Sequence, residues 1–163
     1  MYRAYQLRLA STLPEVRRRM AAGAEAAGRD PNAIRLVAVT KGHPVGALQA
    51  ALDAGLRDLG ENRVEEMEEK VAALGADAAV WHMIGHLQSR KAARAVGVAH
   101  LIHSVDSLRL AERVSRAAGE GSRAARILVQ NGLPGSGYRT WKVIGNDTHT
   151  GTFLSRLRAG ENL

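Results

Sequence analysis

The chain has 163 residues, of which 45% are hydrophobic, so it holds enough apolar side chain for one domain with a buried core. Its formal net charge is +7, but most of the 23 basic residues are scattered singly, which argues against a nucleic-acid partner. The absence of cysteine excludes disulfides, thiolate metal ligands and cysteine nucleophiles. No apolar run reaches the length of a membrane span and the first residues lack a signal-peptide pattern, so we expect a cytoplasmic protein without a membrane partner.

Helical and strand patterns alternate regularly up to residue 130. Apolar residues at steps of three and four predict helices, and short β-branched runs predict strands, of which the first should be buried on both faces. Strand starts recur about every 19 to 25 residues, so we expect an α/β fold built from βαβ units around a parallel sheet. In chain order, we expect helices over 3–27, 45–55, 62–74, 88–96 and from Ser107 onward, and strands over 34–40, 56–59, 80–84, 99–105 and 126–130.

The remaining residues do not continue this alternation. Residues 131–163 hold six glycines and show no sustained period of 2 or 3.6. We therefore divide the chain into a regular part, 1–130, and an atypical Gly-rich tail, 131–163, which we expect to be poorly ordered. Within the tail, 141–144 could form a short strand and 153–157 one helical turn.

Lys41 is the first residue with a candidate chemical role. It ends the first predicted strand, and the functional groups of parallel sheets gather at the carboxyl ends of strands. Lys41 shares a face with Val37 and Val39, so we expect its amine to rise from apolar packing, where desolvation makes an amine nucleophilic toward an aldehyde. The alternative is a lysine whose stem is buried and whose ammonium group reaches solvent.

Polar residues also follow the second, third and fourth predicted strands. Asn62 is suited to cap the next helix, and its amide could also reach a ligand. His82 and His86 face one side of the third strand, but two histidines without a third ligand make a weak metal site. We therefore expect no metal and interpret both as hydrogen-bonded core or rim residues. Ser104 ends the fourth strand, where small polar groups could contact a ligand or cap a helix.

Five blocks of sequence stand at or beside these strand ends. They are Ala27-Gly28-Arg29-Asp30-Pro31, Leu36-Val37-Ala38-Val39-Thr40-Lys41, Gly60-Glu61-Asn62-Arg63-Val64, Trp81-His82-Met83-Ile84-Gly85-His86-Leu87-Gln88-Ser89-Arg90-Lys91 and Ile102-His103-Ser104-Val105-Asp106-Ser107. In this order, the blocks resemble the pyridoxal phosphate homeostasis protein family, whose members are small relatives of the alanine racemase N-terminal barrel. The resemblance extends over residues 1–130.

The resemblance implies a (β/α)₈ TIM-barrel fold of the alanine racemase N-terminal kind, here incomplete, and pyridoxal 5′-phosphate held as a Schiff base on Lys41. It further implies storage or delivery of the cofactor rather than turnover, with cofactor-dependent apoenzymes as the recipients. Asn62 and the corner Ile84-Gly85-His86 match family positions that line the cofactor pocket. We add Ser104 as a candidate cofactor contact, because it ends the fourth strand at the same edge.

The sequence departs from the family pattern in minor and major ways. Glu65, Met83 and Arg90 stand where the family usually has Gln, Phe and Asn, and none of these changes affects Lys41. The major departure is that five strands leave three strand-helix units of a barrel unaccounted for. Those units carry the family's phosphate-gripping segment, and losing three charge-assisted hydrogen bonds would cost about 5 to 9 kcal/mol.

The Gly-rich tail offers a weak substitute for that phosphate site. Gly135-Ser136-Gly137 with Arg139 and Lys142 supplies flexible amides and positive charge, but lacks the spacing and the strand-to-helix context of a phosphate loop. A truncated or frame-altered reading of a longer gene explains the tail more simply.

Two alternative functions stay open at this point. One is a racemase-like enzyme that uses the same cofactor, which would need a base on each face of its carbanion. The other is an inactive, truncated fragment. A barrel that is not closed exposes a sheet edge and its interior, so such a fragment should self-associate through the open edge.

Overall fold

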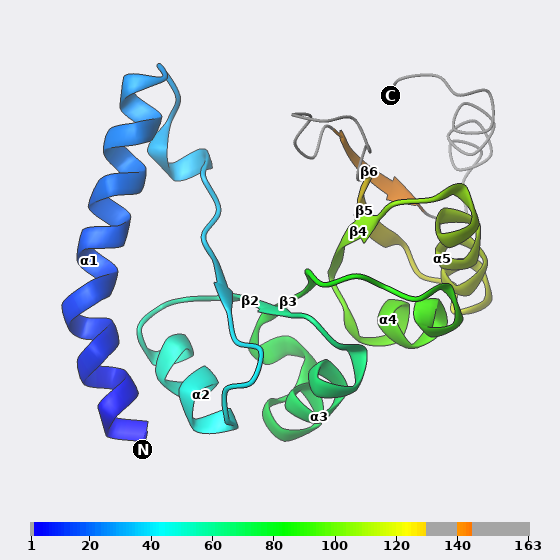
Figure 1. Ribbon diagram of the computed structural model, residues 1–163, viewed down its shortest axis with the longest axis horizontal. Coiled ribbons are helices and arrows are strands. Elements are labelled where there is room, and N and C mark those ends of the chain that lie inside the picture. Colours follow the sequence, from blue (N-terminus) through cyan, green and yellow to red (C-terminus); the bar gives the residue numbers. More distant parts are fainter. Residues whose placement is uncertain (1, 130–139, 145–163) are drawn as a thin grey trace.

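The computed structural model describes residues 2–129 and 140–144 (Figure 1). The fold is α/β, as predicted, because each of the first four strands is followed by a helix. The helices are α1 (Tyr2–Ala26), α2 (Val45–Asp53), α3 (Val64–Leu74), α4 (Ala92–Val98) and α5 (Leu108–Glu120), with short 3-10 turns at Pro31–Ala33, Ala76–Ala78 and Ser89–Lys91. The strands are β1 (Val37–Val39), β2 (Asp58–Glu61), β3 (Val80–Met83), β4 (Leu101–Val105), β5 (Ala125–Val129) and β6 (Thr140–Ile144).

All of these strands belong to one sheet, in the order β1-β2-β3-β4-β5-β6. Strands β1 to β5 are parallel, which confirms the prediction of a parallel sheet built from consecutive units. Strand β6 is antiparallel to β5 and contains the short strand predicted over 141–144. The helical turn predicted over 153–157, and the proposed phosphate loop at 135–137, lie outside the described residues.

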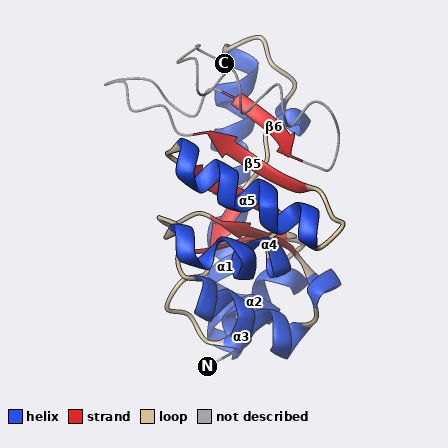
Figure 2. Ribbon diagram, turned by 90° about the vertical axis from the view of Figure 1, so that its right-hand side faces the viewer, coloured by secondary structure: helices blue, strands red, loops and turns tan. Residues whose placement is uncertain are grey.

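The described elements form a crescent. Figure 1 shows the strands on its inner side, helices α2 to α5 along its outer side, and α1 standing beside β1. Figure 2, turned by 90°, shows α5 lying along β5 on the outer side of the sheet. Since every described strand-helix-strand unit places its helix on the same side, one face of the sheet is covered and the other faces the hollow of the crescent.

The core lies between the sheet and its outer helices. Leu59 of β2 and Trp81 of β3 are fully buried there, against Leu48 of α2 and Met67 of α3, which are fully buried as well. Burying a side chain of this size contributes about 1.5 to 3 kcal/mol. Alternation along the strands then directs Gly60, which lies next to Leu59, to the inner face.

Helix α1 follows the predicted range but buries less of its apolar stripe than expected. Leu13 and Ala24 are its buried residues, whereas Val16, which the helical spacing placed on the same stripe, is 41% exposed. The reason is that α1 stands at one end of the crescent, where it packs mainly on α2. Within the part of the chain that the structure describes, no helix combines the length and the apolarity that crossing a membrane requires.

Two local predictions are wrong. Strand β1 is not buried on both faces, because Val39 is 51% exposed on the side that the outer helices do not cover. Helix α3 begins at Val64, and its N-cap is Arg63, which makes no side-chain capping bond, rather than Asn62. By contrast, Ser107 caps α5 as predicted, since its hydroxyl accepts a hydrogen bond from the amide of Leu110.

Candidate functional site

The carboxyl ends of β1, β2 and β3 meet at one edge of the sheet, and three predicted site residues lie along it. The parallel register pairs Val39 with Gly60 and continues into β3. Lys41 lies two residues beyond Val39, Asn62 lies two residues beyond Gly60, and Ile84 directly follows β3. The register therefore places Lys41, Asn62 and Ile84 in neighbouring positions along that edge.

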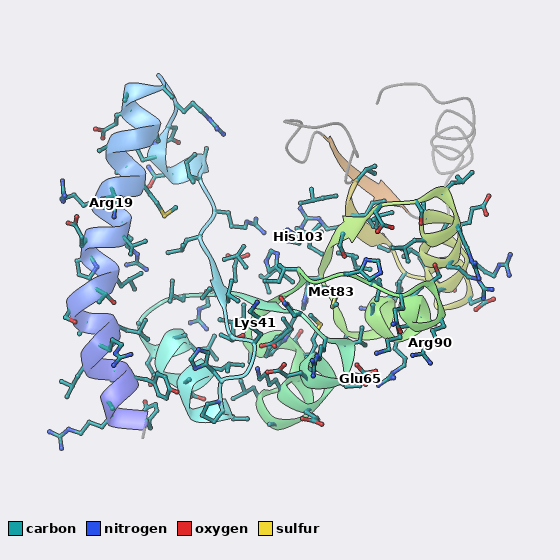
Figure 3. All side chains as sticks on the ribbon, viewed as in Figure 1. Arg19, Lys41, Glu65, Met83, Arg90 and His103 are labelled. Carbon is teal, nitrogen blue, oxygen red and sulfur yellow. The ribbon has the colours of Figure 1, made fainter. Side chains whose placement is uncertain are left out.

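Lys41 lies in the turn that follows β1, and its side chain is exposed. Gly42 completes the turn with a φ of +70°, a left-handed conformation that glycine adopts without strain. The prediction that Lys41 rises from apolar packing is wrong for the described part of the chain, because Val39 on the same face is itself half exposed. The amine of Lys41 therefore lies in solvent at the rim of the inner face, and Figure 3 labels it there.

A group of polar side chains lies behind this turn, on the side of the sheet that faces α3, and all of them except the partly exposed Glu66 are buried. It consists of Thr40, Glu61, Glu66 and Lys70, and we call it the Lys70 cluster. The Lys70 ammonium donates to the Thr40 carbonyl at 2.8 Å, to Glu61 Oε1 at 2.8 Å and to Glu66 Oε1 at 2.7 Å. The Thr40 hydroxyl donates to Glu61, and the amide of Gly42 donates to Glu66. The cluster thus binds the backbone on both sides of Lys41.

Two of the three charged side chains in the Lys70 cluster, Glu61 and Lys70, are buried. An ammonium group has three N–H donors, and Lys70 uses all of them here. The hydrogen bond from Lys70 holds the pKa of Glu66 below its ordinary value, although burial opposes this shift. Glu61 is fully buried, and its second oxygen, Oε2, has no hydrogen-bond partner among the described residues.

Gly85 and Asn62 form a close contact between the loops after β3 and β2. A Cβ atom on Gly85 would lie 2.3 Å from the carbonyl oxygen of Asn62, a distance that real Cβ atoms essentially never show. Ser104 of β4 holds the same corner, because its hydroxyl donates to the Gly85 carbonyl at 2.5 Å. The structure therefore gives Ser104 and Gly85 a direct role in shaping the loop.

A hollow of about 310 Å³ lies beside this corner. Asn62, Gly85 and His86 all line it, so the structure brings three of the six predicted site residues to one cavity. Lys41, Ile84 and Ser104 do not line it. Ile84 lies instead on the inner face, where its Cδ1 atom would be 3.0 Å from a Cβ on Gly60.

A chain of hydrogen bonds crosses the inner face from β4 to the residues before β1. His82 Nε2 lies 2.8 Å from Asp58 Oδ1, and His82 Nδ1 lies 2.8 Å from His103 Nε2. An ionised carboxylate only accepts hydrogen bonds, so neutral His82 donates from Nε2 to Asp58. The Nδ1 atom of His82 is then unprotonated and accepts from Nε2 of His103. Arg35 donates to the same oxygen of Asp58 at 3.2 Å. The chain runs from His103 through His82 to Asp58, with Arg35 closing it.

Both histidines of this chain are held neutral. Burial lowers the pKa of His82, although its hydrogen bond to Asp58 opposes the shift. Burial lowers the pKa of His103 to about 4, and the neighbouring His82 adds to this shift because two protonated imidazoles would repel each other. The interpretation of His82 as a buried, hydrogen-bonded histidine is therefore confirmed, and Figure 3 labels its partner His103 on the inner side of the crescent.

His86 does not share these surroundings. Its side chain is 74% exposed and its Nδ1 lies 3.3 Å from a carboxylate oxygen of Asp106, so it is a rim residue, as predicted. Among the described residues, no group of three or more His, Asp and Glu side chains could hold a metal ion.

Sequence reasoning identified the strand-end residues but missed the side chains that support them. The i,i+4 spacing of Glu66 and Lys70 is typical of an ion pair on a solvent-exposed helix face. Lys70 is nevertheless only 5% exposed and also binds Glu61, which lies on another element. A lysine among the inward positions of an amphipathic helix was the signal that could have found this cluster. His103 carried no such signal, because its partner His82 is 21 residues away in sequence.

Comparison with known proteins agrees with the parallel strand-helix architecture of the described residues. Residues 13–132 match the family model described as alanine racemase, N-terminal domain. The chain belongs to this family, and its strands are therefore part of a TIM-barrel-like fold, as predicted.

Within this family, the chain is similar to pyridoxal phosphate homeostasis proteins. It is 37% identical over 127 residues to the one from Pseudomonas aeruginosa, which covers 78% of this chain and 55% of the relative. PipY of Synechococcus elongatus, solved with pyridoxal phosphate bound, is 42% identical with a TM-score of 0.61, covering 74% of this chain and 57% of PipY. A protein of unknown function from Bifidobacterium adolescentis is 30% identical with a TM-score of 0.70, covering 94% of this chain and 64% of its own. The chain spans about half the length of the curated relatives it matches.

Proposed function

We propose that this chain binds pyridoxal 5′-phosphate through Lys41 and serves in the homeostasis of that cofactor without turning over a substrate. The observation that carries the proposal is the position of Lys41, a solvent-facing primary amine at the carboxyl edge of a parallel sheet. The similarity to pyridoxal phosphate homeostasis proteins, and to PipY with its bound cofactor, supports the same assignment.

The described residues offer groups that suit the aldehyde and the ring of pyridoxal phosphate. Pyridoxal phosphate supplies an aldehyde, which condenses with a primary amine and releases water. Of the three lysines whose side chains the structure describes, Lys70 and Lys91 are engaged in ion pairs with carboxylates, whereas Lys41 has none. Asn62 and His86, which line the neighbouring hollow, supply an amide and an imidazole that can bind polar groups of the ring.

Trapping with borohydride tests the assignment to Lys41. After incubation with pyridoxal phosphate and reduction, peptide mapping should find a pyridoxyl group on the peptide that contains Lys41. Lys41→Arg keeps the positive charge but has no condensing amine, so it should lose this product. Equal labelling of several lysines in the wild type, retained in Lys41→Arg, would contradict the proposal.

The same preparation distinguishes a storage protein from a racemase-like enzyme. Racemisation removes the α-proton of the amino acid and returns one from solvent. We expect no exchange of the α-proton of alanine in deuterated water under conditions that label Lys41. Exchange that is lost in Lys41→Arg would establish the enzymatic alternative instead.

A further inference from the structure

We infer that the Lys70 cluster positions Lys41, with Glu66 and Lys70 as positioning residues that fix the turn from which its amine projects. The inference deepens the proposed function, and it rests on that function for the role of the amine. The cluster itself is defined by contacts among described residues alone.

The first step of the argument is where the sheet stops holding the chain. Strand β1 ends at Val39, and the amide of Thr40 makes the last backbone hydrogen bond to β2, donating to the Gly60 carbonyl at 2.9 Å. Beyond that point the Thr40 carbonyl accepts from the His43 amide at 3.0 Å within the turn, and the other polar backbone groups need other partners or water. The Thr40 carbonyl and the Gly42 amide, which flank Lys41, both bind the Lys70 cluster.

The second step is the direction in which the cluster acts. Thr40 is buried toward α3, whereas Lys41 is exposed, so the cluster and the amine lie on opposite sides of the chain. Among the described residues, neither Glu66 nor Lys70 makes a hydrogen bond or an ion pair with the Lys41 side chain. They act on Lys41 through the backbone, by fixing the carbonyl before it and the amide after it.

The third step is the energetic cost of the cluster. Burying charged groups is expensive, and well-packed apolar residues are often at least as stabilising as a buried ion pair. Here two carboxylates share one ammonium, and Glu61 Oε2 has no partner among the described residues. Apolar residues of similar volume would therefore stabilise the fold at least as well as this cluster does. Charged hydrogen bonds do, however, define a geometry more narrowly than apolar contacts, which is what a reacting amine requires.

Substitutions on one face of α3 test the inference with a matched control. Glu66→Ala removes the acceptor of the Gly42 amide, and Glu66→Gln restores a neutral acceptor. Glu69→Ala is the control, because Glu69 lies on the same helix and is exposed. Because Glu66 is partly exposed, all three variants should fold, and melting curves verify this before the assays.

Two measurements are made on each variant of the full chain. The first is the concentration of pyridoxal phosphate that gives half-maximal borohydride-trapped product at Lys41, measured across a range of pH. The second is amide hydrogen exchange in the peptide that contains residues 40–43, measured without cofactor. Glu66→Ala should weaken trapping about tenfold and speed exchange about tenfold, the loss expected for one charge-assisted hydrogen bond. Glu66→Gln should recover part of both, and Glu69→Ala should match the wild type.

The outcomes separate the two proposals. If the wild type is trapped at Lys41 and Glu66→Ala does not differ from Glu69→Ala, the positioning role is overturned. Faster exchange without weaker trapping overturns it as well. If the wild type is not trapped at Lys41 at all, the proposed function fails. In that case, amide hydrogen exchange of residues 40–43 in Glu66→Ala and in Glu69→Ala decides whether Glu66 holds the turn.

Discussion

Among the described glycines, Gly85 has the least room for a side chain. Its neighbour across the loop is backbone, the carbonyl of Asn62, which cannot rotate away as a side chain could. The same corner carries Ser104 bound to the Gly85 carbonyl and lines the hollow beside the site. A glycine here lets two strand-end loops touch, so the contact shapes the candidate site as well as the fold.

Gly85→Ala should therefore destabilise the protein by about 2 kcal/mol or more, because the added methyl group forces the loops apart. Gly97→Ala is the opposite control. Gly97 lies in α4 with nothing within 4 Å of an added Cβ, so alanine should stabilise the helix by about 0.5 to 1 kcal/mol. Urea unfolding of both variants measures the two signs. Equal changes in the free energy of unfolding for the two substitutions would show that the Asn62 carbonyl does not exclude a side chain at Gly85.

The hydrogen bonds among His103, His82 and Asp58 join three neighbouring strands of the sheet. Each residue comes from a different strand, β4, β3 and β2 in turn. The chain requires neutral imidazoles, because protonation of His82 at Nδ1 would remove the acceptor that His103 uses. The hydrogen bonds that join these strands across the inner face therefore depend on pH.

Stability should fall as the pH decreases from about 6.5 toward 4. In the folded protein the pKa of His103 is lowered to about 4, mainly by burial, and that of His82 is lowered too. Between the unfolded and the folded pKa values the unfolded chain binds more protons, so acid favours unfolding. Urea unfolding at several pH values measures this slope. His103→Gln, which does not titrate, should flatten it, and an unchanged slope in that variant would contradict the assignment.

The described part of the molecule, taken as a whole, is a sheet with helices on one side and an open inner face. Strand β1 forms one edge of this sheet, and its residue Val39 is 51% exposed. An edge strand with an exposed apolar side chain is a pairing surface. Self-association through the edge at β1 therefore stays a prediction, and Val39 is the residue at which it can be tested.

We expect the chain to form larger species as its concentration rises, and Val39→Lys to shift this equilibrium toward the monomer. A charge on the edge strand opposes pairing because it must be desolvated. Val45→Lys is the matched control, since Val45 is 38% exposed but lies on α2, on the outer side of the sheet. Sedimentation at several concentrations measures the effect. A wild type that is monomeric throughout, or equal behaviour of the two variants, would contradict it.

The alternation of helical and strand patterns predicted from the sequence alone that β1 to β5 form a parallel sheet. It also placed Lys41 at a strand end. Both results follow from local periodicity, because which residues turn inward is set by the geometry of each element.

Only the tertiary structure decided what surrounds Lys41. It exposed Val39, buried Lys70 and joined Lys70 to Glu61 and to the Thr40 carbonyl, a residue 30 positions away in sequence. It likewise paired His82 with His103 across two strands. Such contacts depend on which faces the packed elements cover and which side chains they bring together, and no periodicity along the chain encodes that.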